Sequence, residues 1–156
     1  MPDRMIKSWT IDAKVTPQLA FAYLTDISKH AEWSPQPFRV DPVPTLPLKQ
    51  GDKFRSFGSV PGDKDHANDV EVTAIDSPRR LVLTSTDKGK CYVSTFDVEG
   101  TGGGTRIRRT VDAPKPTGFL ALFFPIIFML FIKPEVEKGM RMLQEEVSKL
   151  GAAPSS

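Results

Sequence analysis

The sequence has few of the residues that carry metal and redox chemistry. It contains one cysteine, Cys91, and two histidines, His30 and His66, among 156 residues. A single cysteine excludes an internal disulfide, and so few soft ligands do not make a zinc site of cysteine and histidine. We therefore expect no bound metal and no cofactor, and we interpret Cys91 as an ordinary strand residue.

An excess of charge of one sign is also lacking. The 21 lysines and arginines nearly balance the 19 aspartates and glutamates, which leaves a net charge of +2. Nucleic-acid binding exploits a concentrated positive field, so a nucleic-acid partner is not expected. The glycine-rich stretch 100–104 lacks the Lys-Ser/Thr pair of a phosphate loop, which argues against a nucleotide site. No apolar signal core follows Met1-Pro2-Asp3-Arg4, which favours a cytoplasmic location.

The length of the chain suits one domain. A domain near 150 residues buries roughly 68–70% of its unfolded surface, which is enough for a sizeable core. The sequence shows no internal repeat and no interdomain linker. We expect one domain over residues 1–150, followed by a disordered tail at 151–156.

The N-terminal third predicts a strand followed by two short helices. Residues 5–15 alternate between apolar and mostly polar side chains, as in a half-buried strand. Thr16 and Pro17 supply a helix cap and a first helical residue, which predicts a helix over 17–25. A short helical turn should follow over 28–33. Five prolines between residues 35 and 47 then confine any strand in this stretch to a sheet edge.

The middle of the chain predicts an antiparallel meander, and its last third predicts a helix. Short alternating runs separated by turn residues indicate strands at 53–60, 67–76, 80–86, 91–98 and 105–112. Near the C-terminus, apolar residues recur with the spacing 4, 3, 4, 3, which is typical of one helix face. These residues are Val136, Met140, Leu143, Val147 and Leu150.

This order of elements, with three local motifs, resembles the START-like (SRPBCC) superfamily. The motifs are Glu32-Trp33-Ser34-Pro35 after the short helices, Asp76-Ser77-Pro78-Arg79-Arg80-Leu81 at a strand corner, and Gly103-Gly104-Thr105-Arg106-Ile107 entering the last strand. Within the superfamily the chain is similar to the polyketide cyclase/dehydrase and lipid-transport group. The resemblance implies an α+β helix-grip fold, in which a curved antiparallel sheet of six or seven strands wraps around a long C-terminal helix. Between sheet and helix, relatives enclose a cavity for sterols, lipids, aromatic polyketides or plant hormones.

Arg109 is the sharpest candidate for a ligand contact. It shares one face of its strand with Ile107 and Val111, so it points inward if they do. An inward arginine needs a partner, because an unpaired buried charge is costly. Three alternatives are open: an internal ion pair with Glu71, Asp97 or Asp112, a ligand anchor, or a bulge that turns the side chain outward.

Other candidates for the ligand wall are aromatic or hydroxyl residues. Trp33 either packs against the inner sheet or forms part of the wall with its indole N–H free for a ligand oxygen. Tyr92, Ser94 and Phe96 alternate toward one strand face. Phe128, in the apolar segment described next, completes the set of predicted ligand-binding residues.

The two histidines offer no evident chemistry. His30 lies in a short polar helix and His66 in a charged loop, so both are expected to be solvated. No spacing in the sequence indicates a nucleophile and its base, and no catalytic residue is predicted.

Residues 119–132 form the most unusual stretch, fourteen consecutive apolar residues with Pro125 near the centre. A bilayer-spanning helix needs about 20 residues, so this stretch is too short to span. It is either the buried start of the closing helix, a membrane-surface contact, or a homodimer face. A break at Pro125 would allow the part before it to act as a hinged lid.

Three functions are compatible with the sequence. The first is binding or transport of a small, largely apolar ligand such as a lipid, polyketide or aromatic metabolite in the internal cavity. The second is an aromatic polyketide cyclase or dehydratase. The third is a regulatory protein that contacts a membrane or partner through residues 119–132.

Overall fold

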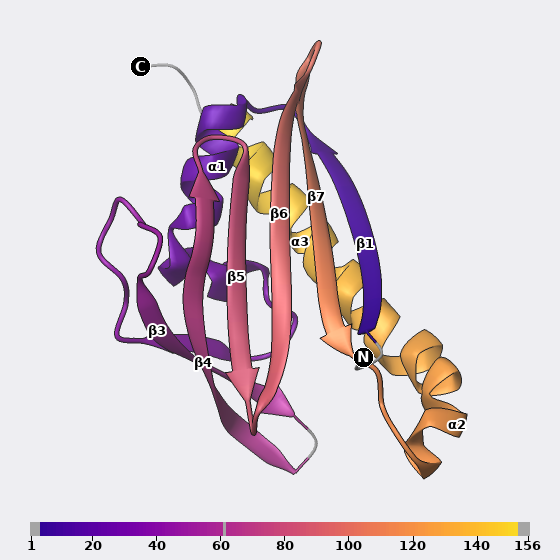
Figure 1. Cartoon of the computed structure of the whole chain (residues 1–156). Helices are drawn as coiled ribbons and strands as arrows, with labels where there is room; N and C mark the ends of the chain where they lie inside the picture. Colours follow the sequence, from indigo (N-terminus) through magenta and orange to yellow (C-terminus); the bar gives the residue numbers. More distant parts are fainter. Residues whose placement is uncertain (1–3, 61, 153–156) are drawn as a thin grey trace.

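The computed structural model describes residues 4–60 and 62–152, which form a curved antiparallel sheet with a long helix across one face (Figure 1). The sheet has seven strands in the order β1-β7-β6-β5-β4-β3-β2. The strands are β1 (Arg4–Ala13), β2 (Phe38–Asp41), β3 (Lys53–Val60), β4 (Asp63–Asp76), β5 (Arg80–Asp87), β6 (Lys90–Thr101) and β7 (Gly104–Pro114). The α+β helix-grip fold is therefore confirmed.

Two groups of helices flank the strands. The first follows β1 and comprises α1 (Pro17–Thr25) and the 3-10 helix η1 (Ile27–Trp33). The second follows β7 and comprises α2 (Phe119–Ile127), the π-helical turn η2 (Phe128–Ile132) and α3 (Lys133–Ala152). The predicted start of α1 is confirmed: the backbone N–H of Leu19 donates to Thr16 Oγ1 at 3.3 Å, and Pro17 is the first helical residue.

The core lies between the concave face of the sheet and α3. Leu143 and Val147 of the predicted helix stripe are completely buried, as are Leu81 and Ile107 on the sheet. Leu150, at the end of the stripe, is 36% exposed. The stripe thus holds α3 against the sheet over its middle turns.

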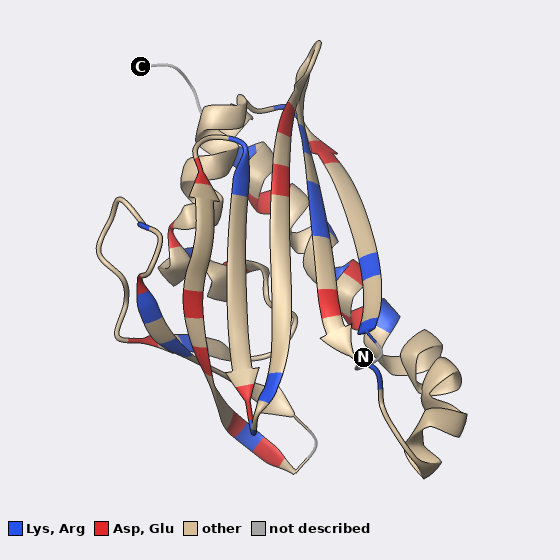
Figure 2. Ribbon diagram, in the orientation of Figure 1, with Lys and Arg blue, Asp and Glu red and all other residues tan. Residues whose placement is uncertain are grey.

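The convex face carries ion pairs between directly opposed residues on neighbouring strands (Figure 2). Arg106 Nε lies 2.9 Å from Asp12 Oδ1, and Arg80 Nε lies 2.7 Å from Asp97 Oδ1. Both pairs are partners in the strand register. Such exposed pairs contribute roughly 0–1 kcal/mol each, but they favour one register because a shift by one residue would separate the charges.

Several strands are longer than the sequence pattern predicts. The β6–β7 hairpin stays paired up to Thr101 and Gly104, beyond the predicted strand ends at residues 98 and 105, so its turn has only two residues. Gly104 also lies against β1, where a Cβ would collide with the carbonyl oxygen of Ala13. Similarly, β4 begins at Asp63 rather than at residue 67.

Gly151 does not end the closing helix, because α3 continues to Ala152. The backbone of Gly151 packs so closely against the chain after β1 that a Cβ would collide with the carbonyl oxygen of Lys14. This glycine therefore serves close packing rather than termination. The rest of the predicted disordered tail, residues 153–156, lies outside the described residues.

The apolar segment is not buried. The elements α2, η2 and α3 form one continuous helix, Phe119–Gly151, and no residue of α2 or η2 is buried. The expectation of a buried helix start is therefore wrong. The helix is also not interrupted at Pro125. The wider turn η2 follows the proline, whose missing N–H removes one bond of the helix ladder.

His66 is not the solvated loop residue that the sequence predicts. It lies on β4, where its Nε2 is 2.8 Å from Asp87 Oδ2 and its Nδ1 is 3.2 Å from Asp63 Oδ2. The hydrogen bond to Asp87 and then that to Asp63 raise the pKa of His66 above its ordinary value. The two contacts of the imidazole therefore tie the start of β4 to the end of β5.

We expect His66→Gln to weaken the pH dependence of stability above pH 6.5. The pKa of folded His66 is raised, so its stabilisation is fully present below the unfolded pKa of about 6.5 and is lost as the pH rises through the folded pKa. Urea midpoints measured from pH 6 to pH 9 should decline for the wild type and stay flatter for the variant. Equal slopes for the two proteins would contradict this role.

Candidate ligand-binding cavity

A cavity of about 350 Å³ lies between the concave face of the sheet, η1 and the first turns of α3. Its volume falls at the lower end of the range found for small-molecule sites. It is lined by His30, Trp33, Ser34, Pro35, Gln36, Phe38, Phe54, Ser56, Val70, Leu83, Ser85, Ser94, Phe96, Arg109, Glu135, Val136 and Gly139. Six of the seven strands contribute to the wall: β3, β5 and β6 each give two alternate side chains, and β2, β4 and β7 give one each.

An aromatic corner forms one end of the cavity. Trp33 is buried and meets Phe96 edge to face, with ring centroids 6.0 Å apart. Trp33 therefore packs against the inner sheet and also lines the cavity, and its contact with a ligand stays a prediction. Among the described residues, its indole Nε1 has no hydrogen-bond partner although the atom is buried.

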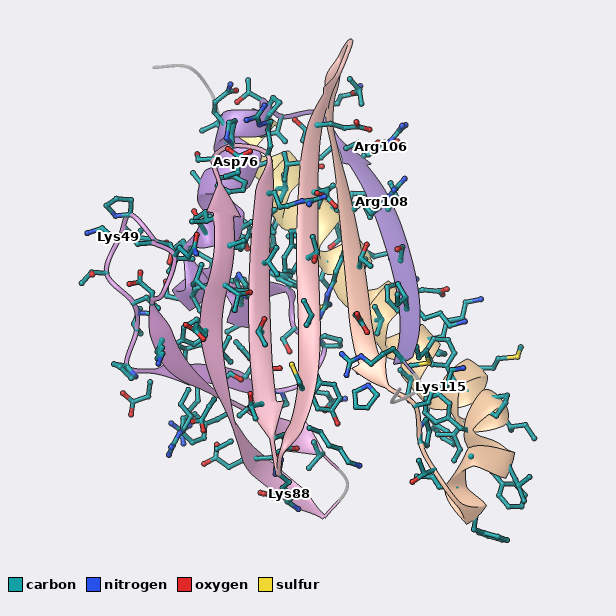
Figure 3. The ribbon with its side chains drawn as sticks, in the orientation of Figure 1. Lys49, Asp76, Lys88, Arg106, Arg108 and Lys115 are labelled. Atoms are coloured by element: carbon teal, nitrogen blue, oxygen red, sulfur yellow. The ribbon has the colours of Figure 1, made fainter. Side chains whose placement is uncertain are left out.

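Arg109 points into the cavity, as the alternation in β7 predicts. It is paired with Phe96 of β6 and with Trp9 of β1 in an unbroken register, so the predicted alternative of an outward bulge is wrong. Arg106 and Arg108, on the other face of β7, extend into solvent (Figure 3).

The expected internal ion pair of Arg109 is also wrong. Within the described part of the chain, no carboxylate oxygen lies within 4.0 Å of its guanidinium. Of the predicted partners, Asp97 pairs with Arg80 and Asp112 pairs with Arg4. Both carboxylates face away from the cavity because they occupy alternate positions on β6 and β7. The Nε atom of Arg109 is buried and has no hydrogen bond to any described residue.

Aromatic rings partly replace a counter-ion for Arg109. The guanidinium carbon lies 5.6 Å from the centroid of Trp33 and 5.7 Å from that of Phe96, within the range of cation–π attraction. Burial lowers the pKa of Arg109 to about 10. The side chain therefore keeps its positive charge at pH 7, and the cavity holds a permanent cation.

His30 is buried, and the expectation that it is solvated is wrong. Its Nε2 lies 2.7 Å from the carbonyl oxygen of Leu24, and its ring centroid lies 5.0 Å from that of Trp33. Burial, with a smaller effect of the charge on Arg109, lowers the pKa of His30 to about 4. The imidazole is therefore neutral at pH 7, and its Nε2–H donates to the carbonyl.

Three of the six predicted ligand residues meet around the aromatic corner, and a fourth lies nearby. Trp33, Phe96 and Arg109 are in contact range of one another. Ser94 also lines the cavity, two residues before Phe96 on the same face of β6. Tyr92 shares the inner face of β6, opposite Ser85, but it does not line the cavity. Phe128 lies outside it as well, on η2, where the ammonium of Lys7 sits 5.3 Å from its ring centroid.

Thirteen of the seventeen lining residues were not among the predicted ligand residues, and His30 and Gly139 show why. His30 precedes Trp33 by three positions, and in a 3-10 helix residues three apart lie on the same side, so the buried tryptophan was a usable signal. Gly139 brings α3 close to the end of η1, where a Cβ would be in ordinary van der Waals contact, 3.4 Å from Pro35 Cδ and from the carbonyl oxygen of Trp33. That contact depends on the tertiary packing and leaves no local sequence signal.

Comparison with known proteins agrees with this architecture. The family described as polyketide cyclase / dehydrase and lipid transport matches residues 8–148. The chain belongs to this family. No curated protein sequence matches the chain significantly.

Solved structures with the same fold have low sequence identity. A protein of unknown function from Staphylococcus aureus has a TM-score of 0.69 at 13% identity and covers 98% of each chain. A Rhodobacter sphaeroides protein has a TM-score of 0.68 at 18% identity, with 95% of this chain and 99% of that chain covered. A point mutant of norcoclaurine synthase from Thalictrum, in complex with a transition-state analogue, has a TM-score of 0.64 at 13% identity, with 96% and 98% covered.

We expect acid to destabilise the protein through His30. The pKa of about 4 in the folded state lies below the unfolded value of about 6.5, so the stabilisation is complete above pH 6.5 and is lost as the pH falls toward 4. The loss should be about 3 kcal/mol, from 1.36 kcal/mol per pKa unit. His30→Gln keeps a donor for the Leu24 carbonyl and removes the titration, so its unfolding free energy should change less between pH 6.5 and pH 5. An unchanged slope in the variant would assign the acid sensitivity to other groups.

Proposed function

We propose that this protein binds a small, largely apolar molecule that carries a carboxylate or another strong oxygen acceptor, and that Arg109 orients it. The observation that carries this proposal is the charge of Arg109 inside an apolar cavity, with no carboxylate of the described chain within 4.0 Å. Burying an unpaired cation is costly, so a ligand anion that completes its hydrogen bonds would gain a charge-assisted, bidentate contact.

The rest of the cavity wall suits an apolar body. Phe54, Val70, Leu83 and Val136 surround the space with hydrocarbon, whereas the serines Ser56, Ser85 and Ser94 supply small hydroxyls. Such a wall removes apolar ligand surface from water and leaves orientation to a few polar groups. Membership of a family described by cyclisation, dehydration and lipid transport supports a ligand of this kind. The norcoclaurine synthase complex supports it further, because that protein of the same fold holds a small molecule.

Arg109→Met should weaken binding of an anionic probe without weakening binding of its neutral counterpart. Naphthoic acid and naphthalene methanol have the same aromatic body and differ in charge, so titration calorimetry with both isolates the contribution of the guanidinium. We expect the affinity for naphthoic acid to fall about tenfold or more, the range for a charge-assisted hydrogen bond. Arg109→Lys should give an intermediate loss, because a lysine keeps the charge but not the planar fork of donors.

Arg108→Met is the matched control for this experiment, since Arg108 lies on the same strand with its side chain in solvent. It should bind both probes as the wild type does. If Arg109→Met changes only the melting temperature and neither affinity, Arg109 has a structural role and the proposed anchor is wrong.

Trp33→Phe tests the indole N–H separately from the packing. Phenylalanine keeps an aromatic ring against Phe96 but removes the buried donor, which has no partner among the described residues. We expect the free energy of unfolding to rise or stay the same, because an unsatisfied polar group is lost. If the ligand accepts a hydrogen bond from Nε1, the affinity for naphthoic acid should also be severalfold weaker. Thermal melts and calorimetry distinguish these effects, and unchanged affinity would leave Trp33 as a purely apolar wall residue.

Catalysis of a cyclisation is the second candidate, favoured by the presence of His30 and Arg109 in the same cavity. Arg109 could stabilise an enolate oxygen, but a histidine with a pKa of about 4 is a weak base at neutral pH. Long incubation with a poly-β-keto substrate mimic, followed by mass and absorbance measurements, separates the two functions. A binder returns the compound unchanged. An enzyme converts it, and Arg109→Met then lowers turnover more than affinity.

A further inference from the structure

The first part of the closing helix projects from the body of the protein as an exposed apolar element. We call residues 119–132 the apolar projection. Phe119, Leu122 and Met129 are 77%, 73% and 67% exposed, which is unusual for large apolar side chains. Figure 1 shows α2 beyond the end of the sheet, next to the N-terminal end of β1.

The exposed side chains of the apolar projection surround the helix instead of forming one stripe. At 100° per residue, the exposed residues Phe119, Leu120 and Ala121 of α2 point in directions at least 100° apart. A protein partner, including a second copy of this chain, covers one side of a helix and would select an amphipathic stripe. Hydrocarbon of a lipid leaflet covers all sides at once, so the distribution favours lipid.

Lysines are the charged residues nearest to the apolar projection in the sequence, and they lie at its base, where Lys133 is also 3.9 Å from Glu137 Oε1. Figure 2 shows α2 without any charged residue, and the sequence has no carboxylate between Asp112 and Glu135. Lys115 lies at the end of β7 beside the base (Figure 3), and Lys133 follows the last apolar residue. Lys7 reaches Phe128 from β1. An apolar tip with lysines at its base matches the polarity of an anionic membrane surface, with hydrocarbon inside and phosphates at the headgroup level.

The length of the apolar projection fits insertion from one side. Its fourteen residues are about 21 Å long at 1.5 Å per residue, shorter than a hydrocarbon core of about 30 Å. The whole helix, Phe119–Gly151, has 33 residues and an 18-residue window of mean hydropathy 2.0, which would suffice for spanning by length and composition alone. However, Leu143 and Val147 bind its second half to the sheet. Only the apolar projection is free to enter lipid.

The cavity opens beside the base of the apolar projection. Glu135 and Val136 line the cavity and come two and three residues after Lys133 in α3. Gln36 Nε2 lies 3.4 Å from Glu135 Oε2, so both residues of this exposed contact lie at the cavity rim. Insertion of the projection would therefore bring the cavity rim close to the headgroups.

We propose that residues 119–132 insert into one leaflet of an anionic lipid bilayer and dock the protein with its cavity rim at the membrane surface. The insertion does not depend on the proposed ligand function, although it would give an apolar ligand a short route from lipid to cavity. The apolar burial supplies the binding energy, and Lys115 and Lys133 supply the preference for anionic headgroups.

The test is sedimentation of the full chain with vesicles. Vesicles of phosphatidylcholine alone and of phosphatidylcholine mixed with phosphatidylglycerol should both bind the wild type, and the mixed vesicles should bind it more tightly. The double variant Leu122→Glu/Met129→Glu should bind at least about fiftyfold more weakly, because each carboxylate opposes entry into hydrocarbon. Its melting temperature should match the wild type, since both side chains are exposed.

Matched controls use exposed apolar residues elsewhere. Val43 and Leu46, in the loop between β2 and β3, are 56% and 57% exposed, so Val43→Glu/Leu46→Glu changes the charge equally and should leave vesicle binding intact.

Lys115→Gln/Lys133→Gln should reduce the preference for phosphatidylglycerol. Phe119→Trp should show a blue-shifted emission on binding that lipids brominated in the acyl chains quench.

Three results would overturn the proposal. The first is that the wild type stays in the supernatant with both kinds of vesicle. The second is that the Leu122→Glu/Met129→Glu variant binds vesicles as the wild type does. The third is that the wild type forms a stable dimer and this variant does not. Sedimentation velocity without lipid detects the dimer. Binding of naphthoic acid to the same variant is expected to be unchanged, so a failure of membrane docking is distinguishable from a failure of the ligand function.

Discussion

Strand β7 lies between β1 and β6, and its unbroken antiparallel register determines which charges enter the interior. Along this strand, alternate residues face the cavity, so Ile107 and Arg109 point inward while Arg106 and Arg108 point outward. On the convex side, the pairing of Arg106 with Asp12 stabilises this register. A shift by one residue would bring two arginines into the core and expose Ile107, so the register is strongly specified. The position of the cavity cation follows from this constraint.

The interior around that cation combines groups that do not neutralise it. His30 is neutral, and Trp33 and Phe96 offer only the negative faces of their rings. A carboxylate at this place would have stabilised the empty protein more effectively. It would also have occupied the guanidinium. Burial of the guanidinium without a carboxylate partner in the described chain therefore costs folding stability, and the proposed ligand anchor would account for that cost.

Much of the fold could be predicted from the sequence because strand alternation and helix spacing are local patterns. The inward direction of Arg109 could be predicted from the alternation of side chains along a strand alone. The lack of a carboxylate partner for Arg109 could not be predicted, because Asp97 and Asp112 pair on the outer face with Arg80 and Arg4, which are distant in sequence. The solvated assignment of His30 failed for a similar reason. Its neighbours in sequence are polar, whereas its neighbours in space are aromatic. For residues 119–132, composition gave the apolar character but could not show whether the fold covers it.

The continuity of the helix from Phe119 to Gly151 has a mechanical consequence. Val136 and Gly139 form part of the cavity wall, and they belong to the same rod as the exposed residues before Lys133. A force that tilts the exposed end is therefore transmitted to the wall, with the packed turns around Leu143 as the fulcrum. The wide π turn η2 lies between the two parts, and π turns are places where helices bend. The stiffness of η2 determines how much a tilt of the exposed end changes the width of the cavity.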